Sequence, residues 1–321
     1  MPELPEVETI KLGLQKRIIG LKIQKIQILS PKSFIGNPNL ASGQIVLNIW
    51  RRGKILGIDL GTSLRATAKQ SSQEITHTQI ASSQTPRNDN SITLLFHLKM
   101  TGQLVYISGD ERLTINDKRF IGGHPTEDML GKMPNAHTRV IFNFSDGSHL
   151  YFNDQRKFGW VRVVHGSEFT VHGKDILENL GPEPLEKDFT WQVLKNNLMK
   201  HKNMPVKVAI MDQSVVSGVG NIYSNEACFD AKIDPATLVS QMSDKQFQAL
   251  YHGTIKALQD GIKHGGSTVA HFVDPEGHKG YFLDYAFVYG RNNHPCKVCG
   301  TEIKKITLGG RGTYFCPHCQ K

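Results

Sequence analysis

Short apolar segments dominate the first half of the chain, and many of them are rich in residues that favour extended backbone. They are separated by Gly, Pro and Asn, a pattern typical of β-strands. We predict strands at 22–29, 44–50, 54–60, 91–98, 103–107, 139–144, 148–153 and 160–164. So many short strands in one stretch predict a β-sandwich or a barrel.

A helix is predicted ahead of these strands. Pro5 suits the first turn of a helix, because an N–H group at that position would make no intrahelical hydrogen bond. Acidic residues follow it and favour the positive end of the helix dipole. Val7, Ile10 and Leu14 then recur at helical spacing and form one apolar stripe. The N-terminal segment is therefore predicted to be an amphipathic helix.

From about residue 174 the apolar positions take on helical spacing. Helices are predicted at 175–181, 189–201, 206–212, 221–231 and 244–265. The first of these is expected to end at Gly181, because Pro182 behind it cannot continue a helix. The chain therefore runs from a strand-rich part to a helical part, with no internal repeat.

The segment 67–91 follows neither pattern. It consists mainly of Ser, Thr, Gln and Asn and has hardly any apolar residues. Because such a composition cannot build a packed core, we predict a mobile, solvated loop that interrupts a strand hairpin.

The composition narrows the class of protein. The chain has 321 residues, of which 39% are hydrophobic and 21% charged, which indicates a globular protein and excludes wholesale disorder and a fibrous repeat. It has no run of about 18 apolar residues and no secretory signal, so we expect a cytoplasmic protein without a membrane span. The formal net charge of +9 favours a polyanionic partner.

Four of the five cysteines lie in the last thirty residues, in two C-x-x-C pairs separated by sixteen residues. Each pair can place two thiolates about 2.3 Å from one tetrahedral Zn²⁺. Cys296, Cys299, Cys316 and Cys319 are therefore predicted to hold one Zn²⁺, with no coordination position left open for catalysis. A disulfide scaffold would spread its cysteines through the chain, so a reducing compartment is favoured.

Between the cysteine pairs, residues 304–315 predict a β-hairpin whose Gly-rich tip, 309–312, contains Arg311. One guanidinium on a zinc-held hairpin suits the binding of a phosphate. Zinc ribbons are widely used, so the tail alone leaves a generic zinc-ribbon transcription or translation factor open.

The N-terminus offers a candidate nucleophile. Removal of Met1, which the small Pro2 permits, would expose a secondary amine. Such an amine attacks an aldehyde-level carbon and gives an iminium ion with a permanent positive charge, and Glu3 beside it can supply or remove protons. By themselves these residues form a commonplace N-terminus.

Several motifs together resemble the bacterial formamidopyrimidine-DNA glycosylase family. They are MPELPEVET, RRGKIL, HLKMTG, NDQRKFG, LGPEPL, MDQSVVSGVGNIYSNE, GGSTV, GYF, VYGR and the four-cysteine tail, in the family's order. The resemblance implies an enzyme of base excision repair that removes oxidised purines, such as 8-oxoguanine and formamidopyrimidines, and nicks the strand by β,δ-elimination. It implies double-stranded DNA as the partner of a monomer.

The resemblance also implies a multidomain α+β fold. A catalytic β-sandwich domain with an N-terminal helix would span 2–165, a helix–two-turn–helix DNA-binding domain 174–285, and a zinc ribbon 287–321. A base-capping loop would lie at about 265–282. This chain has Ala270 there, where relatives often carry a basic residue, so recognition of 8-oxoguanine is less firmly implied than the excision chemistry.

Five catalytic roles follow from the matched positions. Pro2 would attack the sugar C1′ and form the Schiff base, and Glu3 would protonate the sugar ring oxygen. Glu6 would support the site, although it could equally favour the helix dipole. Lys54 would bridge phosphate and base and donate a proton in β-elimination. Arg311 would donate a proton or clamp a phosphate in δ-elimination.

The other matched positions concern the DNA duplex. Because the damaged nucleotide must leave the base stack, other groups must fill the gap. Met100, Arg156 and Phe158 match the family's wedge: an apolar chain, a guanidinium for the orphaned cytosine and a stacking ring. His137, Lys207 and Asn221 match positions that contact the DNA backbone.

Two alternatives remain open at this point. An endonuclease VIII-like relative would prefer oxidised pyrimidines, although MPELPE in place of MPEGPE and the RKFG segment argue against it. A catalytically silent protein could bind damaged DNA with the same fold, although the joint presence of Pro2, Glu3 and Lys54 argues against that.

Overall fold

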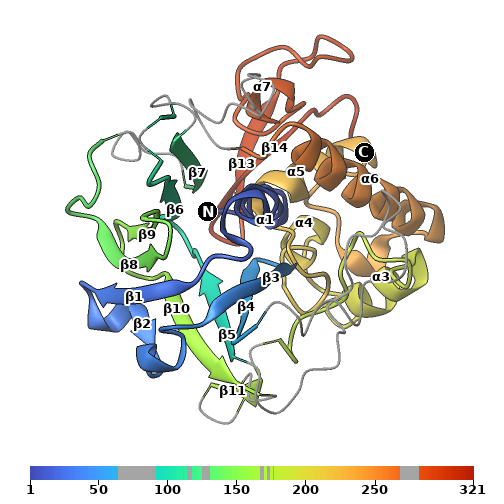
Figure 1. Cartoon of the computed structure of the whole chain (residues 1–321). Helices are drawn as coiled ribbons and strands as arrows, with labels where there is room; N and C mark the ends of the chain where they lie inside the picture. The colour runs from blue at the N-terminus through green and yellow to red at the C-terminus, as the bar shows by residue number, and fades with distance from the viewer. Residues whose placement is uncertain are drawn as a thin grey trace. The chain divides into compact units, whose positions relative to one another are not determined.

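The computed structural model describes residues 1–63, 92–110, 112–113, 118–124, 131–166, 170–171, 174–175, 177–267 and 282–321 (Figure 1). Contacts group the described residues into two compact units. Unit 1 comprises residues 1–2 and the described part of 6–175, and unit 2 comprises residues 3–5, 177–267 and 282–321. The predicted insert at 67–91 and most of the predicted base-capping loop lie outside the described residues.

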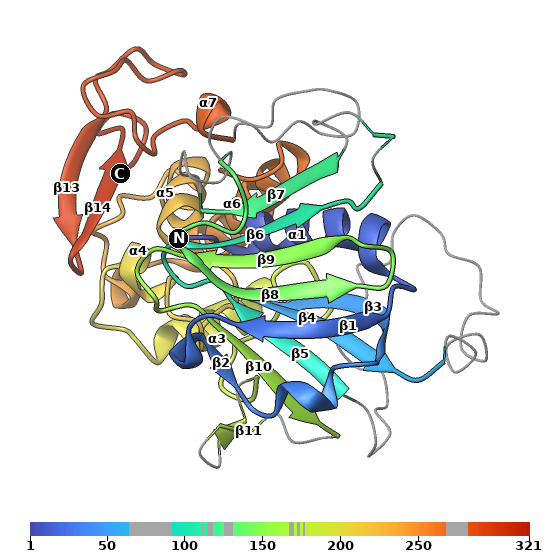
Figure 2. The same cartoon turned by 60° about the vertical axis from the view of Figure 1, so that its left-hand side comes forward.

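Unit 1 is built on two five-stranded sheets, seen in Figure 2. One has the order β1 (Ile23–Ile28), β8 (Thr138–Phe144), β9 (His149–Asp154), β6 (Gly102–Ile107), β7 (Arg119–Gly123). The other has the order β2 (Phe34–Ile35), β10 (Trp160–His165), β5 (Ile92–His97), β4 (Ile55–Gly61), β3 (Ile45–Arg52). All neighbouring strands are antiparallel except β2 and β10. Short 3₁₀ helices at Pro31–Ser33 and Pro38–Leu40 flank β2, and β11 (Thr170–Val171) pairs with β12 (Lys174–Asp175).

One hydrophobic core joins the two sheets, which makes unit 1 a sandwich, as predicted. Phe96 of β5 contacts Phe142 and Phe152 of the other sheet, with ring centroids 5.6 and 6.4 Å apart. The helix α1 (Leu4–Ile18) adds its predicted apolar stripe to the same core, where Val7, Ile10 and Leu14 are buried. The apolar face of the helix therefore has the role that its spacing predicted.

Each of the eight predicted strands is present within about two residues of its predicted ends. Four strands of the described residues were missed. β2, β11 and β12 are only two residues long, and β7 ends in Gly122 and Gly123, which weaken the strand pattern.

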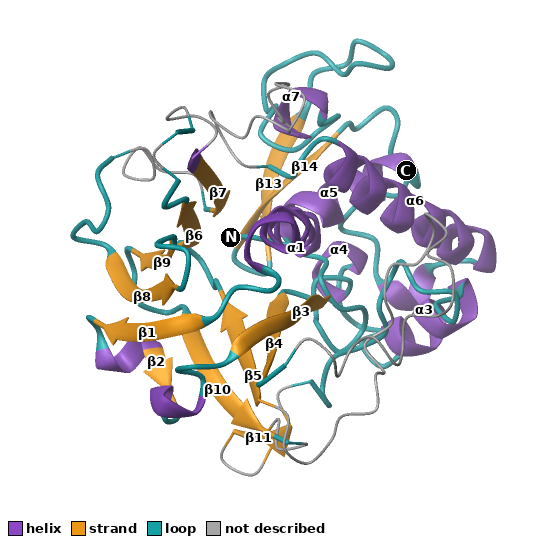
Figure 3. Ribbon diagram, in the orientation of Figure 1, coloured by secondary structure: helices purple, strands orange, loops and turns teal. Residues whose placement is uncertain are grey.

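Unit 2 is mainly helical (Figure 3). Its helices are α3 (Trp191–Met199), α4 (Val206–Ala209), α5 (Asn221–Asp230), a 3₁₀ turn at Val239–Gln241, α6 (Asp244–Lys263) and α7 (Phe282–Tyr285). Strands β13 (Lys304–Leu308) and β14 (Arg311–Phe315) form the predicted hairpin. α6 begins with a capping box of Ser243 and Gln246, and its N-terminal half packs Phe247 and Leu250 into the core of the unit.

One predicted helix was wrong. Residues 174–175 belong to strand β12, and residues 177–179 form a single turn that the bond from Leu180 N to Leu177 O closes. Gly181 N donates instead to Gln213 O at 2.7 Å. The segment is too short for a stable helix, so long-range hydrogen bonds decide its conformation. α4 is likewise one turn long, shorter than the predicted 206–212.

Candidate active site and nucleic-acid interface

The Glu3 carboxylate caps the N-terminus of α5. Ile222 N donates to Glu3 Oε1 at 2.8 Å, and Tyr223 N donates to Glu3 Oε2 at 3.4 Å. The helix has no capping side chain of its own, since its N-cap residue is Gly220. Amide donors at the start of a helix favour a negative charge, so the helix holds the Glu3 carboxylate in a defined place. Only 2% of the Glu3 surface is exposed.

The glycines of the Gly-Val-Gly-Asn turn make room for this contact. A Cβ on Gly220 would lie 2.4 Å from Glu3 Cδ. A Cβ on Gly218 would lie 2.6 Å from Leu4 Cβ, and Leu4 N donates to Gly218 O at 3.0 Å. In the structure these glycines admit the N-terminal residues of the chain itself.

Lys207 and Asn221 lie side by side next to this cap. The Lys207 amine donates to Asn221 Oδ1, and Asn221 Nδ2 donates to Gly312 O at 3.2 Å. Burial lowers the pKa of Lys207 to about 8, with Glu3 opposing and Arg311 reinforcing the shift. Lys207 is therefore a buried amine that hydrogen-bonds to Asn221 and interacts electrostatically with Glu3 and Arg311. These four residues form one polar cluster in unit 2.

Arg311 begins strand β14 directly after the turn of the hairpin and is exposed. We predicted it within the glycine tip, but it pairs with Leu308 as the first residue of the strand. β14 is fixed to α5 by Asn221 and also by Asn225, whose Oδ1 accepts from Tyr314 N at 2.7 Å. The guanidinium therefore projects from an anchored strand.

Glu226 fixes the segment that leads to the hairpin. Its carboxylate accepts from the backbone N–H groups of Phe287, Val288 and Tyr289 at 2.8–3.0 Å. Glu226 is buried, and this burial raises its pKa against the opposing effect of the three donors. Three residues of one helix, Asn221, Asn225 and Glu226, thus position the cysteine-rich tail.

The four predicted ligands Cys296, Cys299, Cys316 and Cys319 converge. Their sulfur atoms all lie within 4.8 Å of one another. Cys296 Sγ lies 4.0 Å from Cys319 Sγ, and Cys299 Sγ lies 3.5 Å from Cys316 Sγ. A tetrahedron with Zn–S bonds of about 2.3 Å has sulfur–sulfur edges of about 3.8 Å. The four cysteines therefore fit one Zn²⁺, whose role is structural because they fill all four positions.

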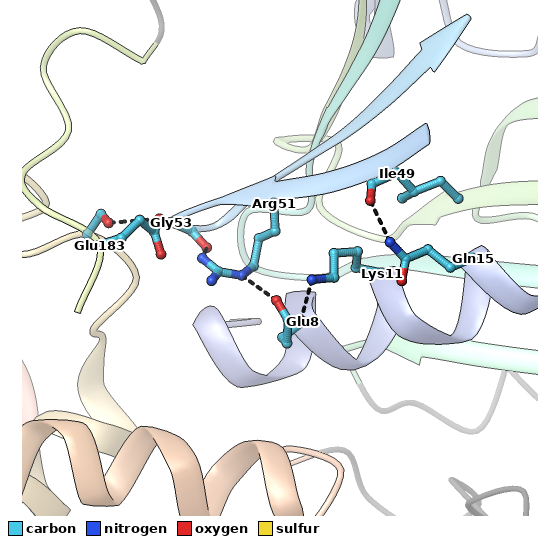
Figure 4. A network of polar contacts seen from close by, with 8 residues as sticks. Glu8, Lys11, Gln15, Ile49, Arg51, Gly53 and Glu183 are labelled. Atoms are coloured by element: carbon cyan, nitrogen blue, oxygen red, sulfur yellow. Dashed lines mark hydrogen bonds and ion pairs between the residues drawn. The ribbon is translucent and has the colours of Figure 1, made fainter. Parts of the chain in front are cut away.

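Lys54 lies in the two-residue turn between β3 and β4, and it is buried. Gly53 before it has a φ of 55°, in the left-handed region that glycine adopts most easily. Arg51 Nη1 donates to Gly53 O at 3.2 Å, while Arg51 Nε donates to Glu8 Oε2 at 2.9 Å (Figure 4). Glu8 also pairs with Lys11. A buried ion network on α1 therefore holds the turn that presents Lys54.

Met100 lies in a tight turn between β5 and β6. Gly102 N closes this turn on Leu98 O at 2.8 Å, and Lys99 has a φ of 51°. Lys99 N also donates to His97 Nδ1 at 3.0 Å. Burial, together with the charges of Lys99 and Lys54, lowers the pKa of His97 to about 3, so the ring is neutral and can accept this bond.

Arg156 and Phe158 form an exposed pair in the loop between β9 and β10. The Arg156 guanidinium carbon lies 5.2 Å from the centre of the Phe158 ring, in a cation–π arrangement. Phe158 is 57% exposed, although most large rings of unit 1 are buried. An exposed ring next to a guanidinium is not a core residue, which favours the wedge role over packing.

His137 lies in the loop before β8. Its backbone N–H donates to Asn135 Oδ1 at 2.9 Å, and its carbonyl accepts from Asp154 N at 2.9 Å. Pro2 and Glu6 are both buried and belong to unit 1. The structure thus gathers Glu3, Lys207 and Asn221 in unit 2, and it places Met100, Arg156, Phe158 and His137 on neighbouring loops of unit 1.

Sequence reasoning missed several residues that support these positions. They are Glu8, Arg51, His97, Thr101, Asp154, Asn225 and Glu226. One signal was available for most of them, since each is a polar residue inside or at the end of an apolar element, where an unpaired polar group would be costly. Their partners lie far away in the sequence, so the pattern could not name them.

Comparisons with known proteins match the whole chain. A family model described as the formamidopyrimidine-DNA glycosylase N-terminal domain matches residues 1–161. A second, described as the formamidopyrimidine-DNA glycosylase H2TH domain, matches residues 180–273, and a third, a zinc finger found in FPG and IleRS, matches residues 293–321.

Full-length relatives and a solved structure agree. The chain is 35% identical to the formamidopyrimidine-DNA glycosylase of Pelotomaculum thermopropionicum, covering 100% of this chain and 99% of the relative. It is 33% identical to that of Listeria innocua, covering 100% of both. It is also similar to a mutant Lactococcus lactis FPG in complex with a Fapy-dG-containing DNA, with a TM-score of 0.76, 29% identity and 100% coverage of both chains. The chain therefore belongs to the formamidopyrimidine-DNA glycosylase family.

Proposed function

We propose that this chain is a bifunctional DNA glycosylase and AP lyase that excises oxidised purines from double-stranded DNA in base excision repair. Its family and its N-terminal Pro2-Glu3 pair support this function. The Lactococcus lactis relative was solved with DNA that contains a formamidopyrimidine lesion, which supports the same class of substrate.

The proposed chemistry begins at the N-terminus. Once Met1 is removed, the Pro2 nitrogen attacks the sugar C1′ and the bond from C1′ to the purine nitrogen breaks. The purine leaves with one proton, which balances the proton that the Pro2 nitrogen gives up. Glu3 protonates the sugar ring oxygen, the ring opens, and a cationic iminium between Pro2 and C1′ results. The capping of α5 supports this role, because it fixes the carboxylate of Glu3, the residue that directly follows the nucleophile Pro2 in the sequence.

The iminium then withdraws electrons for strand cleavage. Loss of a proton from C2′ expels the 3′ phosphate in β-elimination, and a further proton loss expels the 5′ phosphate in δ-elimination. We assign to Lys54 the bridging of phosphate and base and the proton donation in β-elimination. We assign to Arg311 either proton donation or the clamping of a phosphate in δ-elimination. Glu6 would support the site from the first turn of α1.

DNA binding would use the remaining matched residues. Met100, Arg156 and Phe158 would fill the gap left by the everted nucleotide, and His137, Lys207 and Asn221 would contact the DNA backbone. No helix within the described residues has the length and apolarity that crossing a membrane requires. We propose that the protein acts as a monomer on DNA in the bacterial cytoplasm.

The observation that carries the proposal is the Pro2-Glu3 pair in a chain of this family, and covalent trapping tests it. Borohydride reduces an iminium to a stable amine, so the protein should become linked through Pro2 to duplex DNA containing an abasic site or 8-oxoguanine opposite cytosine. Intact mass and peptide mapping would locate the link. Pro2→Gly should lose base excision, and Glu3→Gln should lose at least about 100-fold in excision rate.

A matched control blocks the nucleophile without changing any residue. Protein that carries an uncleaved N-terminal extension should bind the same DNA but form no adduct. Binding without trapping by the free protein would instead identify a silent damage-binding protein, and preferential excision of oxidised pyrimidines would identify an endonuclease VIII-like enzyme. Attachment of the DNA to a lysine would also contradict the proposal.

A further inference from the structure

Asp154 is a fully buried acid that the chemistry proposed above does not use. It is the last residue of β9, and its exposed fraction is 0%. The antiparallel register places it opposite Gly102 at the start of β6, and Asn153 opposite Thr138 at the start of β8. Three chain segments therefore meet at this end of the sheet, and Asp154 stands at their junction.

The first segment is the turn that carries Met100. The hydroxyl of Thr101, the next residue, donates to Asp154 Oδ1. Thr101 Oγ1 in turn accepts from Arg156 N at 3.0 Å. One hydroxyl thus connects the Met100 turn to the carboxylate and to the Arg156 loop.

The second segment is the loop that carries Arg156 and Phe158. Arg156 N donates to Asp154 Oδ1 at 3.2 Å, and Gly159 N donates to Oδ2 at 2.6 Å. The carboxylate therefore accepts from both Arg156 and Gly159, and only residues 157 and 158 lie between these two donors. Lys157 at the apex of this loop has a φ of 60°, a conformation that is costly for a residue with a side chain. The closed loop sustains this conformation and exposes the Phe158 ring.

Gly159 shows how closely the loop approaches Asp154. A Cβ added there would lie 2.9 Å from Phe152 Cζ, 3.1 Å from Asp154 Oδ2 and 3.2 Å from His97 O. A larger residue would push the backbone away from the carboxylate. The short bond from Gly159 N thus depends on glycine at this position.

The third segment is the loop that carries His137. Asp154 N donates to His137 O at 2.9 Å, and Arg139 Nε donates to Asp154 O at 2.8 Å. The backbone of the same residue thereby fixes the third loop. Asp154 contacts all three segments that carry Met100, His137, Arg156 and Phe158.

We propose that Asp154 is a positioning residue that sets the wedge for insertion into DNA. Its carboxylate fixes the Met100 turn relative to the Arg156–Phe158 loop, so the three wedge side chains enter the base stack together. This inference rests on the proposed function, since the wedge role comes from it. Preorganisation matters here because every side chain that must be ordered on binding lowers the affinity.

The Asp154→Asn variant tests the proposal. An amide has nearly the same shape, but its NH₂ group would face the N–H of either Gly159 or Arg156 and cannot accept a hydrogen bond from it. A 2-aminopurine beside the lesion brightens when it is unstacked, so stopped-flow fluorescence reports wedge insertion. We expect insertion of the wedge at an 8-oxoguanine–cytosine pair to be about tenfold slower, or more, in this variant than in the wild type.

A second readout separates positioning from general damage to the protein. Borohydride trapping at a preformed abasic site involves no base pair to break, so we expect it to stay within about threefold of the wild-type rate. Thr101→Ser keeps the hydroxyl and should insert at the wild-type rate. Thr101→Val lacks the hydroxyl and should be slow, like Asp154→Asn. Zinc content and melting temperature are measured for each variant.

Asp146→Asn is the matched control. Asp146 lies in the turn that joins β8 and β9, where its carboxylate accepts from Ser148 N at 3.0 Å and from Ser148 Oγ. The same substitution is thus made in a loop-fixing aspartate of the same hairpin that touches no wedge segment. It should leave insertion unchanged.

Two results would overturn the proposal. One is insertion at the wild-type rate in Asp154→Asn, and the other is an equal loss of insertion and of abasic-site trapping, which would indicate a general structural role. Failure of the wild-type protein to form any adduct would reject the proposed function instead. The fluorescence comparison would still decide about Asp154, because insertion precedes the chemistry.

Discussion

At the scale of single residues, buried charged groups carry much of the organisation. Glu8 on α1 pairs with Arg51 and Lys11, and all three are largely buried. Burial alone would raise the pKa of Glu8, but the two cations together lower it below its usual value of 4.5. The ionised form is therefore more stable in the folded protein than in the unfolded chain.

Glu8→Gln should consequently destabilise the protein at neutral pH. Removing one partner of a buried ion pair leaves the other uncompensated, so we expect a loss of about 3 kcal/mol in the free energy of unfolding. Urea unfolding followed by tryptophan fluorescence measures it. Glu8→Gln should also slow β-elimination, measured as nicking of an abasic-site duplex, if the turn of Gly53 and Lys54 is no longer fixed.

The sign of the pH dependence follows from the lowered pKa. The stabilising effect of ionised Glu8 is complete well above pH 4.5 and is lost as the pH falls through its lower folded pKa. The gap between wild type and Glu8→Gln should therefore shrink below about pH 4.5. Glu302→Gln, in an exposed pair with Lys304, is the control and should cost less than about 1 kcal/mol. A pH-independent gap would contradict the role of the charge.

At the scale of elements, α5 connects the proposed acid of the reaction with the zinc ribbon. Its N-terminus binds Glu3, and its side chains bind the segment before the ribbon and strand β14. The hairpin contributes little stability of its own, since two five-residue strands rarely fold alone in water. Its core is a small cluster around Val288, Ile303 and two of the ligand cysteines, Cys296 and Cys316. The ribbon therefore depends on its metal.

Removal of zinc should release Arg311 and abolish tight DNA binding. Because metal binding and folding of such a ribbon are coupled, a chelator should disorder the hairpin while α6 and the sheets of unit 1 remain. Fluorescence anisotropy with an abasic-site duplex measures affinity, and circular dichroism checks the remaining structure. Unchanged affinity after verified metal loss would reject this account.

Two buried cysteines provide the matched control. Cys316→Ala should lose both zinc and DNA affinity. Cys228→Ala removes an equally buried thiol, which lies in α5 outside the cysteine cluster, and should keep one zinc per chain.

At the scale of the whole molecule, the excess of positive charge favours binding to the negatively charged DNA backbone. The formal net charge is +9, and phosphate binding releases counterions from DNA. The affinity should therefore fall steeply as the salt concentration rises. The logarithm of the binding constant should decrease with the logarithm of salt by about 0.9 for each phosphate neutralised.

Arg311→Gln should reduce this slope by about 0.9, because it would remove one phosphate contact. Lys304→Gln changes the net charge equally and lies in the same hairpin, but Lys304 is paired with Glu302 at 2.7 Å. It should change the slope much less. Equal slopes for the two variants would show that Arg311 adds only to the general charge.

The sequence by itself determined the local structure and the metal ligands. Most of the longer strands, together with α1, α3, α5 and α6, followed from the period of apolar positions, because that period reflects which face each element buries. The cysteine spacing identified the zinc ligands. Short elements such as β2 and the turn at 177–179 were missed or misassigned, since few residues give a weak pattern that distant partners override.

Only the tertiary structure decided which distant residues support the site. Asp154 reaches Thr101 and His137 because of the register of β9 with β6 and β8, and no local pattern specifies a register between strands so far apart in the chain. Glu3 likewise finds the start of α5 more than two hundred residues away. Hydrogen bonds of this kind depend on the packing of whole elements, so they become visible only once the chain has folded.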